Sequence, residues 1–186
     1  MGIIQGKKIL LRSATGNDKR IIYEWMAHSD TTSSHMGPPD FPDNPIPTYE
    51  QFCLDYKAYF FNGTEPKLGR CFMIIVDNNP VGQINYDKID ENNKRTELDI
   101  WMNCRANCGR GYGADALKTL CDYLFKKYGI LEFVVRPSAR NHQAVRFYEK
   151  MGFHRIKITD EQQKIEFGRG DYSDSIVLIK KNSRNQ

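Results

Sequence analysis

The sequence predicts a single α/β domain of the α+β type, in which a mixed, mostly antiparallel sheet of about six to seven strands is flanked by helices. Alternating runs at 81–88 and 96–102 are separated by a polar turn, which is typical of an antiparallel hairpin. A glycine-rich turn and a helical pattern then lead to an apolar run at 131–136, which is the order of a βαβ crossover. At 186 residues, one domain spanning 1–186 is the default.

The N-terminal part is predicted to hold one strand, two helices and a long connection. Residues 8–13 form the expected first strand, and polar turn residues then begin a helix that continues through Met26. Prolines and a glycine exclude regular helix from most of 30–48, so this segment is predicted to be a lid or a mobile loop. Thr48 is expected to cap a second helix that buries Phe52, Tyr56, Tyr59 and Phe60.

The rest of the chain is expected to complete the sheet. A short apolar run at 71–76 reads as the strand that precedes the hairpin. The later predicted elements are a helix after the glycines, a strand at 131–136, a helix from Asn141, a strand at 153–158, a loop at 161–172, a strand at 175–180 and a frayed tail at 181–186.

Three glycines alternate at Gly109, Gly111 and Gly113, directly before the helical pattern. Glycine allows unusual backbone dihedrals and lets a ligand approach the main chain closely. The first N–H groups of a helix have no partner within the helix, and the helix dipole adds partial positive charge at the same end. The segment is therefore predicted to bind an anion, with phosphate as the first choice.

A dinucleotide-binding fingerprint is one interpretation of this loop, because Gly109-x-Gly111-x-x-Ala114 fits its spacing. That fingerprint requires the loop to follow the first strand of a βαβ unit directly, whereas a hairpin precedes it here. The next strand should also end in an acidic residue, but it ends in Arg136. An NADP-binding oxidoreductase is therefore the weakest alternative.

Two linked motifs support another interpretation. Gly-Arg-Gly-Tyr-Gly-Ala-Asp-Ala-Leu (109–117), followed by Asn-His-Gln-Ala-Val-Arg-Phe-Tyr-Glu-Lys-Met-Gly-Phe (141–153), resembles the GNAT superfamily of acyl-CoA-dependent N-acetyltransferases. The resemblance implies that acetyl-CoA is the cofactor, with its pyrophosphate on the glycine loop and its pantetheine arm near the second motif. The cofactor-binding residues that it implies are Trp101, Met102, Asn103, Cys108, Gly109, Arg110, Gly111, Tyr112, Gly113, Ala114, Asn141, Ala144 and Tyr148.

The N-terminal part extends the resemblance. Leu-Arg-Ser-Ala-Thr-Gly-Asn-Asp together with Tyr-Glu-Trp-Met (10–26) is similar to the opening of enzymes related to the aminoglycoside 6′-N-acetyltransferases. Leu98-Asp99 and the stretch 136–141 are in register with the same branch, so the resemblance covers roughly 8–158. Two positions depart from it. Cys108 replaces the usual Gln or Arg, and Arg136 replaces an acid, which disfavours a polycationic acceptor or selects an anionic group.

Tyr148 lies on the apolar stripe of the second predicted helix, so it is either a core tyrosine or a catalytic one. When an amine attacks a thioester, the leaving group is a thiolate, which a nearby donor can protonate. Tyrosine, with a reference pKa near ~10, is neutral and able to donate at pH 7. The motif position favours Tyr148 as the general acid.

The acceptor amine must also lose a proton before it can attack. Alternation in the strand 96–102 places Glu97, Asp99 and Trp101 on one face. Carboxylates are rarely buried without a partner, so either carboxylate is an amine-binding or catalytic group, or part of a salt bridge. Asp99 matches the acidic position of the aminoglycoside branch and Glu97 matches the glutamate of the branch that acetylates protein N-termini; Asp99 is the favoured base, directly or through water.

Composition excludes several classes of protein. The net charge of +4 suits a polyanionic cofactor and falls well short of a nucleic-acid-binding footprint. No apolar run approaches the ~20 residues that span a bilayer, and the N-terminus has no signal-peptide pattern. The five cysteines show no paired spacing, so we expect reduced thiols in a cytoplasmic protein without a metal site. We expect a monomer or homodimer.

These observations together predict an acetyl-CoA-dependent N-acetyltransferase that acts on a primary amine of a small molecule, by direct attack in a ternary complex. Aminoglycoside-like amines are possible acceptors. The alternatives are an enzyme that acetylates protein N-termini, as ribosomal-protein acetyltransferases do, and a non-catalytic module that binds acyl-CoA. No motif in the sequence identifies the acceptor.

Overall fold

The computed structural model describes residues 2–35, 46–167 and 175–182. Its described part contains one eight-stranded sheet, in the order β1-β2-β3-β4-β5-β6-β8-β7. Only the pair β5–β6 is parallel, so the prediction of a mixed, mostly antiparallel sheet is confirmed, with one strand more than expected. The strands are β1 Ile3–Gln5, β2 Leu10–Ser13, β3 Gly69–Val76, β4 Asn79–Asp87, β5 Arg95–Met102, β6 Glu132–Val135, β7 His154–Arg155 and β8 Leu178–Lys181.

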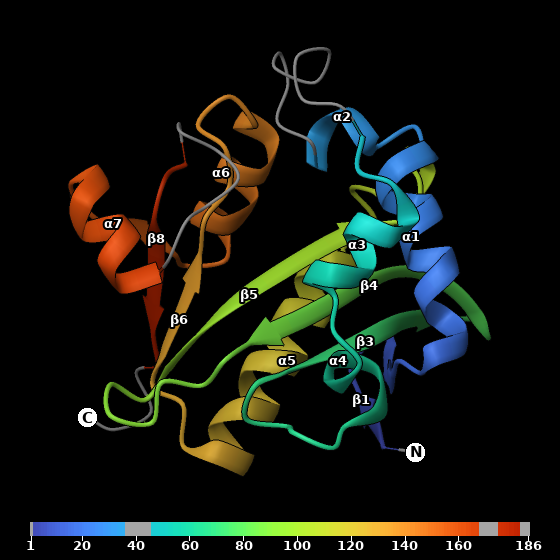
Figure 1. The fold of residues 1–186 in the computed structure, drawn as a ribbon, viewed down its shortest axis with the longest axis horizontal. Coiled ribbons are helices and arrows are strands. Elements are labelled where there is room, and N and C mark those ends of the chain that lie inside the picture. The colour runs from blue at the N-terminus through green and yellow to red at the C-terminus, as the bar shows by residue number, and fades with distance from the viewer. Residues whose placement is uncertain (1, 36–45, 168–174, 183–186) are drawn as a thin grey trace.

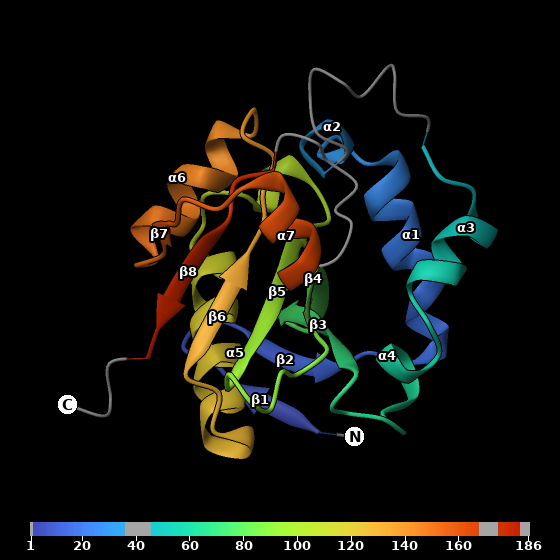
Figure 2. The same ribbon diagram turned by 60° about the vertical axis from the view of Figure 1, so that its left-hand side comes forward.

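Helices cover both faces of the sheet. The long helix α5 lies on one face, while α1, α3 and α4 lie on the other (Figures 1 and 2). The helix α7 is on the same side as α1, in front of β5 and β6 in Figure 2. The helices are α1 Lys19–His28, α2 Thr32–His35, α3 Tyr49–Asp55, α4 Tyr59–Asn62, α5 Tyr112–Tyr128, α6 His142–Lys150 and α7 Asp160–Phe167, with short 3₁₀ turns at Gly16–Asp18 and Arg105–Asn107.

The β3–β4–β5 meander follows from local turn chemistry. Asp77 and Asn78 adopt positive φ angles of 48° and 64°, the conformation of a two-residue hairpin turn. Aspartate and asparagine tolerate this conformation better than most residues. The second hairpin closes at the bridge between Asp90 and Arg95. Both turns are in the positions that the sequence predicts.

Two apolar clusters hold the layers together. On one face, the buried side of α5, including Leu117, Leu120 and Leu124, packs with Ile84 and Leu98 of the sheet. On the other face, aromatic side chains from α1, α3 and α4, including Trp25, Phe52 and Phe60, pack against β3 and β5, and Trp101 of β5 belongs to the same cluster. Alternating residues of β5 therefore contribute to different clusters, as the period of two requires.

Two N-terminal predictions need correction. Residues 3–5 form an additional edge strand, β1, which is too short for a periodic signal in the sequence. The predicted second helix is two helices, because the chain leaves helical dihedrals at Tyr56, where ψ is 76°. Thr48 caps the first of them with Gln51 in a capping box, as predicted. Of the predicted loop 30–48, Thr32–His35 is helical, and 36–45 lies outside the described residues.

The C-terminal region differs most from expectation. The prediction of a loop at 161–172 is wrong up to Phe167, because α7 forms there; the rest lies outside the described residues. Thr159 and Gln162 form reciprocal hydrogen bonds around the start of α7, which is the capping-box pattern of Ser/Thr followed three residues later by Glu/Gln. The predicted strand 153–158 is reduced to His154–Arg155. The predicted strand 175–180 is Leu178–Lys181.

Candidate active site

The glycine loop ends at the first turn of α5. Gly109 and Gly111 have φ angles of 73° and 84°, so both positions require the left-handed conformation that glycine accepts. Gly113 is already helical. A Cβ on Gly109 would meet no described atom within 4 Å, so the loop faces open space. No side chain caps the start of α5, which leaves its first N–H groups available to an anion.

Neighbouring residues form hydrogen bonds with this loop and with the start of α5. The Lys8 ammonium donates to the Arg110 carbonyl at 3.4 Å. The Asp115 carboxylate accepts hydrogen bonds from the backbone N–H groups of Lys8 and Ile9, which ties the β1–β2 turn to α5. The Cys108 side chain is exposed, and its thiol donates to the Cys104 carbonyl at 3.6 Å.

The strands β5 and β6 separate after Glu97. Their parallel ladder has three residue pairs, from Arg95↔Glu132 to Glu97↔Val134. From Leu98 to Met102, β5 pairs with β4 on its other side, but it has no ladder to β6. The two strands start together and then diverge in Figure 1. The diverging part of β5 thus offers a strand edge beside the glycine loop, which suits an extended, amide-containing chain.

Some backbone groups of the residues that the resemblance assigns to the cofactor already have protein partners. The Met102 carbonyl accepts from the Thr31 hydroxyl at 3.1 Å. The Asn103 N–H donates to the Val81 carbonyl at 2.9 Å. The Trp101 side chain is buried in the aromatic cluster, with its ring edge-on to Tyr56 at 6.1 Å. Cofactor contacts at these residues would thus use their remaining backbone groups.

Asn141 caps α6, as predicted. Its side-chain oxygen accepts from the Ala144 N–H at 3.1 Å. The cap fixes the start of the helix that carries Tyr148, and Ala144 contributes its small side chain to the packing beside α5. The cofactor role of Asn141 and Ala144 stays a prediction.

Tyr148 is 6% exposed and lies against Phe147 and Phe153. Burial raises the pKa of its hydroxyl well above the usual range, and the negative charges of Asp99 and Glu97 raise it further. The hydroxyl is therefore neutral at pH 7 and can donate a proton. The charges of Asp99 and Glu97 act on this hydroxyl, so the predicted acid and the predicted bases lie within electrostatic range of one another.

The two carboxylates have different surroundings in the structure. The Arg136 guanidinium forms an ion pair with Glu97, with 2.8 Å between Nε and Oε1. The predicted salt bridge is therefore present at Glu97, and the positive charge of Arg136 is balanced within the site. This pairing removes the reason for expecting Arg136 to repel a polycationic acceptor.

Asp99 has no ion pair among the described residues, and part of its side chain is exposed. Protein atoms still surround it on several sides. This burial, followed by the charge of Glu97, raises the pKa of Asp99 to about 6, while the Ile100 N–H and Arg136 act in the opposite direction. A carboxylate with this pKa is ionised at neutral pH and is a stronger base than an ordinary aspartate.

Two further polar residues near these carboxylates were not singled out from the sequence. Asp87 at the end of β4 is crowded by Glu97 and Asp99, and burial with their charges raises its pKa to about 7. Asn85 is paired in register with Asp99 and donates to Asp87. The alternation of Gln83, Asn85 and Asp87 in a buried strand was a usable signal, because polar groups there need partners.

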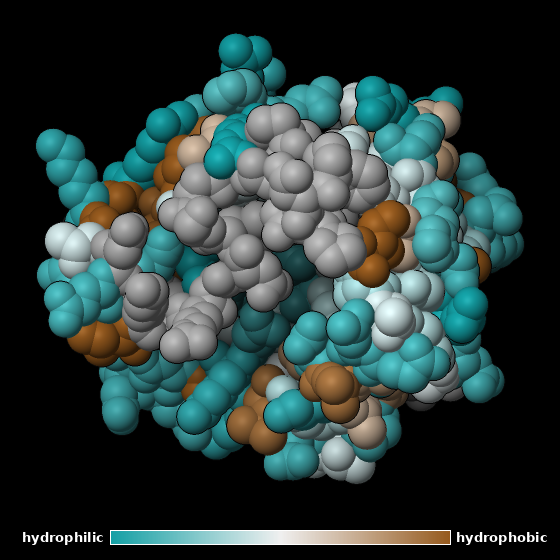
Figure 3. All heavy atoms as spheres, turned by 45° about the horizontal axis from the view of Figure 1, so that its top comes forward, coloured by the Kyte–Doolittle hydropathy of each residue, from teal (hydrophilic) through white to brown (hydrophobic). Residues whose placement is uncertain are grey.

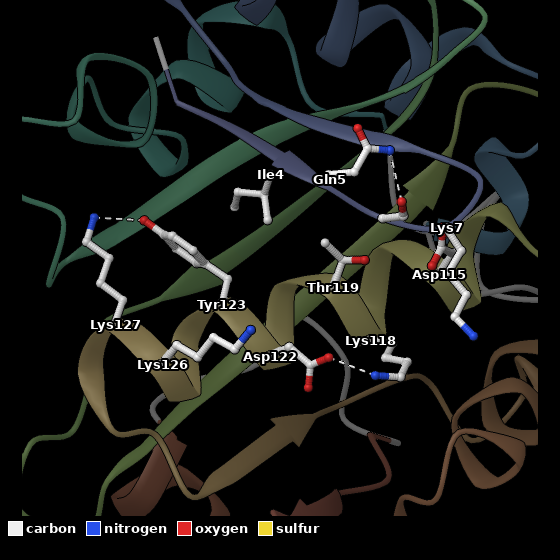
Figure 4. Close-up of a pocket in the computed structure, with 11 residues that line it drawn as sticks. Ile4, Gln5, Lys7, Asp115, Lys118, Thr119, Asp122, Tyr123, Lys126 and Lys127 are labelled. Atoms are coloured by element: carbon white, nitrogen blue, oxygen red, sulfur yellow. Dashed lines mark hydrogen bonds and ion pairs between the residues drawn. The ribbon is translucent and has the colours of Figure 1, made fainter.

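Two cavities lie in different parts of the molecule. One, of about 630 Å³, is lined by Asp87, Glu97, Arg136 and neighbouring residues of the second hairpin. Figure 3 shows a hollow with hydrophilic residues on the face opposite α5. The other, of about 460 Å³, lies between β1 and α5, where its labelled side chains include Asp115, Lys118 and Asp122 (Figure 4). No predicted site residue lines this second cavity.

The described residues contain no group of three or more His, Cys, Asp or Glu side chains that could hold a metal ion. All five cysteines are free thiols. No helix in the described part of the chain is long and apolar enough to cross a membrane.

Comparison with known proteins agrees with this geometry. The family model for the acetyltransferase (GNAT) domain matches residues 8–154. A search of curated proteins finds no match. Aminoglycoside acetyltransferase AAC(6')-Ib in complex with coenzyme A is 18% identical, with a TM-score of 0.68 over 92% of this chain and 94% of that chain.

Two other solved structures share the fold. RimL, a ribosomal alpha-N-protein acetyltransferase in complex with coenzyme A, is 16% identical, with a TM-score of 0.72 over 97% of this chain and 98% of that chain. Spermidine N-acetyltransferase from Vibrio cholerae, in complex with CoA and spermine, is 18% identical, with a TM-score of 0.70 over 95% of this chain and 96% of that chain.

The fold, the glycine loop and the diverging strands define an acyltransferase-type site. The chain belongs to the GNAT acetyltransferase family. It is an N-acetyltransferase, and acetyl-CoA is its cofactor. The free N–H groups at the start of α5 and the open space beside Gly109 fit the cofactor's phosphates.

Proposed function

We propose that this protein transfers an acetyl group to a primary amine of a cationic small molecule. The observation that carries the proposal is the shared site of Asp99 and Tyr148. One is an accessible carboxylate without an ion pair among the described residues, and the other is a buried neutral hydroxyl that interacts with it electrostatically. A base and an acid with separated pKa values are the pair that amine acetylation needs.

The cofactor, when bound, supplies an acetyl thioester. The glycine loop and the start of α5 would hold its phosphates, and the free edge of β5 would align its extended arm. Asp99 holds the acceptor ammonium and takes its proton, directly or through water. Tyr148 donates its hydroxyl proton to the leaving sulfur. Glu97, held by Arg136, keeps a second negative charge beside Asp99.

The charge balance of the acceptor side favours a cationic molecule. Three carboxylates, those of Asp87, Glu97 and Asp99, perturb one another electrostatically, and Arg136 lowers the pKa of each. With one arginine against three carboxylates, the ionised site is net negative. The structural similarity to acetyltransferases of aminoglycosides and spermidine is compatible with such an acceptor.

An amine panel tests this proposal. Purified protein and acetyl-CoA are incubated with aminoglycosides, polyamines, amino acids and N-terminal peptides, and products are read by mass, because the protein's thiols would react with a thiol reagent. We expect transfer to polyamines or aminoglycosides. Transfer to peptides alone would identify a protein N-terminal acetyltransferase, and bound CoA without transfer to any amine would contradict the proposed reaction.

A further inference from the structure

The acceptor side continues beyond Asp99. Asp99 is paired in register with Asn85, and Asp87 follows two residues later on the same face of β4. A diagonal pair of this kind on neighbouring antiparallel strands is separated by ~7–8 Å. Asp87 also lines the 630 Å³ cavity, together with Glu97 and residues of the second hairpin. A second acidic position therefore lies at a defined distance from the reacting one.

Asn85 gives an independent reason to expect a ligand there. It is 3% exposed, and its side-chain nitrogen donates to Asp87 at 3.4 Å. Its side-chain oxygen is buried and accepts no hydrogen bond from the described residues. A buried acceptor without a donor is unfavourable, so the site is incomplete in the protein alone. A bound ammonium group carries three donors and would satisfy it.

Glu97 and Asp87 differ in whether they are available to bind a cation. Glu97 has Arg136 as its ion-pair partner, whereas Asp87 has no ion pair among the described residues. The pKa of Asp87, raised to about 7 by burial and by the charges of Glu97 and Asp99, indicates a carboxylate whose charge is poorly compensated. A cation at Asp87 would relieve that repulsion and would favour the ionised form.

We infer that Asp87 and Asn85 form a second ammonium-binding subsite, so that the preferred acceptor is a diamine or polyamine whose reacting nitrogen lies at Asp99 and whose second nitrogen lies at Asp87. This inference rests on the proposed function. The separation of the two positions matches a linear spacer of about four to six methylene groups between the nitrogens.

A chain-length series tests the subsite on the wild-type enzyme. Diamines from 1,3-diaminopropane to 1,8-diaminooctane are each compared with the n-alkylamine of equal carbon number, and kcat/KM is measured by product mass. The expected ratio of diamine to monoamine is largest near 1,5-diaminopentane and is roughly tenfold or more there. A ratio near one at every length would overturn the subsite while leaving the acetyltransferase reaction intact.

The variant Asp87→Asn keeps the shape of the side chain and removes its charge. It should lower the diamine-to-monoamine ratio by about tenfold, through KM for the diamine rather than through kcat. Asp77→Asn is the matched control, because Asp77 is exposed in the β3–β4 turn, where asparagine accepts a positive φ. An Asp87→Asn ratio equal to that of wild type would contradict the inference.

The subsite can be tested even if the proposed transfer reaction does not occur. If no amine is acetylated, calorimetry of 1,5-diaminopentane and pentylamine binding to the CoA-loaded protein reads the subsite without turnover. Binding of the diamine that is at least about tenfold tighter than that of pentylamine would retain the subsite without the reaction. Equal or undetectable binding of both amines would overturn the subsite as well.

Discussion

Individual residues of the site depend on contacts that are distant in sequence. The structure pairs Glu97 with Arg136, 39 positions along the chain, and leaves Asp99 as the accessible carboxylate. Spacing in the strand places both acids on one face but says nothing about which of them has a cation beside it. The assignment of Asp99 as the base therefore depends on tertiary contacts that the local pattern does not contain.

Replacing Tyr148 by phenylalanine keeps the buried ring and removes the proton donor. We expect kcat to fall by about 10²-fold or more, since general acid catalysis contributes on that scale. The Kd for CoA should stay within about twofold, because the ring still packs against Phe147 and Phe153. Steady-state kinetics and calorimetry measure the two quantities, and an unchanged kcat would remove Tyr148 as the acid.

Asp99 should also affect the pH dependence of folding stability. Its folded-state pKa, about 6, is above the value of about 3.9 expected in the unfolded chain. The folded state therefore retains a proton that the unfolded state releases, and Asp99 lowers stability as pH rises from about 4 to about 6. The variant Asp99→Asn should melt at a higher temperature than wild type at pH 7.5, with little difference near pH 3.5.

Thermal unfolding at both pH values checks this expectation. Asp77→Asn again serves as the control, since Asp77 is an exposed residue of the β3–β4 turn. If Asp99→Asn lowered the melting temperature at pH 7.5, the ionised Asp99 would stabilise the folded state. That result would contradict a folded-state pKa above the unfolded value.

At the scale of single elements, the glycine loop contains two different kinds of glycine. Gly111 has a φ of 84°, so alanine there is strained by roughly 1–2 kcal/mol. Gly113 is helical, and a Cβ would make ordinary contacts of 3.6 Å or more with Ile100 and Phe147. Although both glycines fit the motif, of these two only Gly111 has a positive φ angle that requires glycine.

We therefore expect Gly111→Ala to lower the free energy of unfolding and to weaken CoA binding. Gly113→Ala should leave stability unchanged or raise it by about 0.5–1 kcal/mol, because alanine favours the helix. Denaturant unfolding and calorimetry distinguish the two variants. Equal destabilisation by both would show that the loop does not require the left-handed conformation at Gly111.

The ion pair between Glu97 and Arg136 joins β5 to the end of β6. Both side chains are mostly buried, with 20% and 14% exposed, so Arg136→Gln leaves a carboxylate without its partner. We expect a loss of about 2 kcal/mol at pH 7, below the 3–5 kcal/mol typical of fully buried pairs. Adding Glu97→Gln should recover part of this loss.

Arg155→Gln provides the comparison for that variant. Arg155 also pairs with a glutamate at 2.9 Å, but both side chains are about half exposed. An exposed pair contributes only about 0–1 kcal/mol, so its loss should be small. Chemical denaturation measures both variants, and equal losses would mean that burial does not distinguish the two pairs.

At the scale of the whole molecule, the fold places the site where its sheet opens. The ladder between β5 and β6 stops at Glu97, so the carboxylates, the free edge of β5 and the start of α5 meet at one opening. The strand β5 therefore carries residues that are predicted for the cofactor site, Trp101 and Met102, and residues that are predicted for catalysis, Glu97 and Asp99.

Much of this architecture was predictable from the sequence. Hairpin turns at 77–78 and 90–93, the glycine-capped α5 and the cap at Asn141 follow from local chemistry. The opening between β5 and β6 was not, because the length of a parallel ladder depends on how α5 and α6 pack. The break at Tyr56 and the ion pair between Glu97 and Arg136 likewise arise from contacts between elements. For Asn85 and Asp87, the alternation of polar residues in β4 was a signal that the sequence did contain.

The pH dependence of the transfer reaction tests the central claim most directly, that Asp99 is the base for the acceptor amine. We measure kcat/KM from pH 5 to pH 8 with the best acceptor of the amine panel, for wild type and Asp99→Asn. Wild type should show an acidic limb of unit slope with a midpoint near pH 6, because the reactive form carries the Asp99 carboxylate. Asp99→Asn should be at least about 10²-fold slower and lack this limb. An unchanged limb in the variant would assign the ionisation to another group and contradict the account.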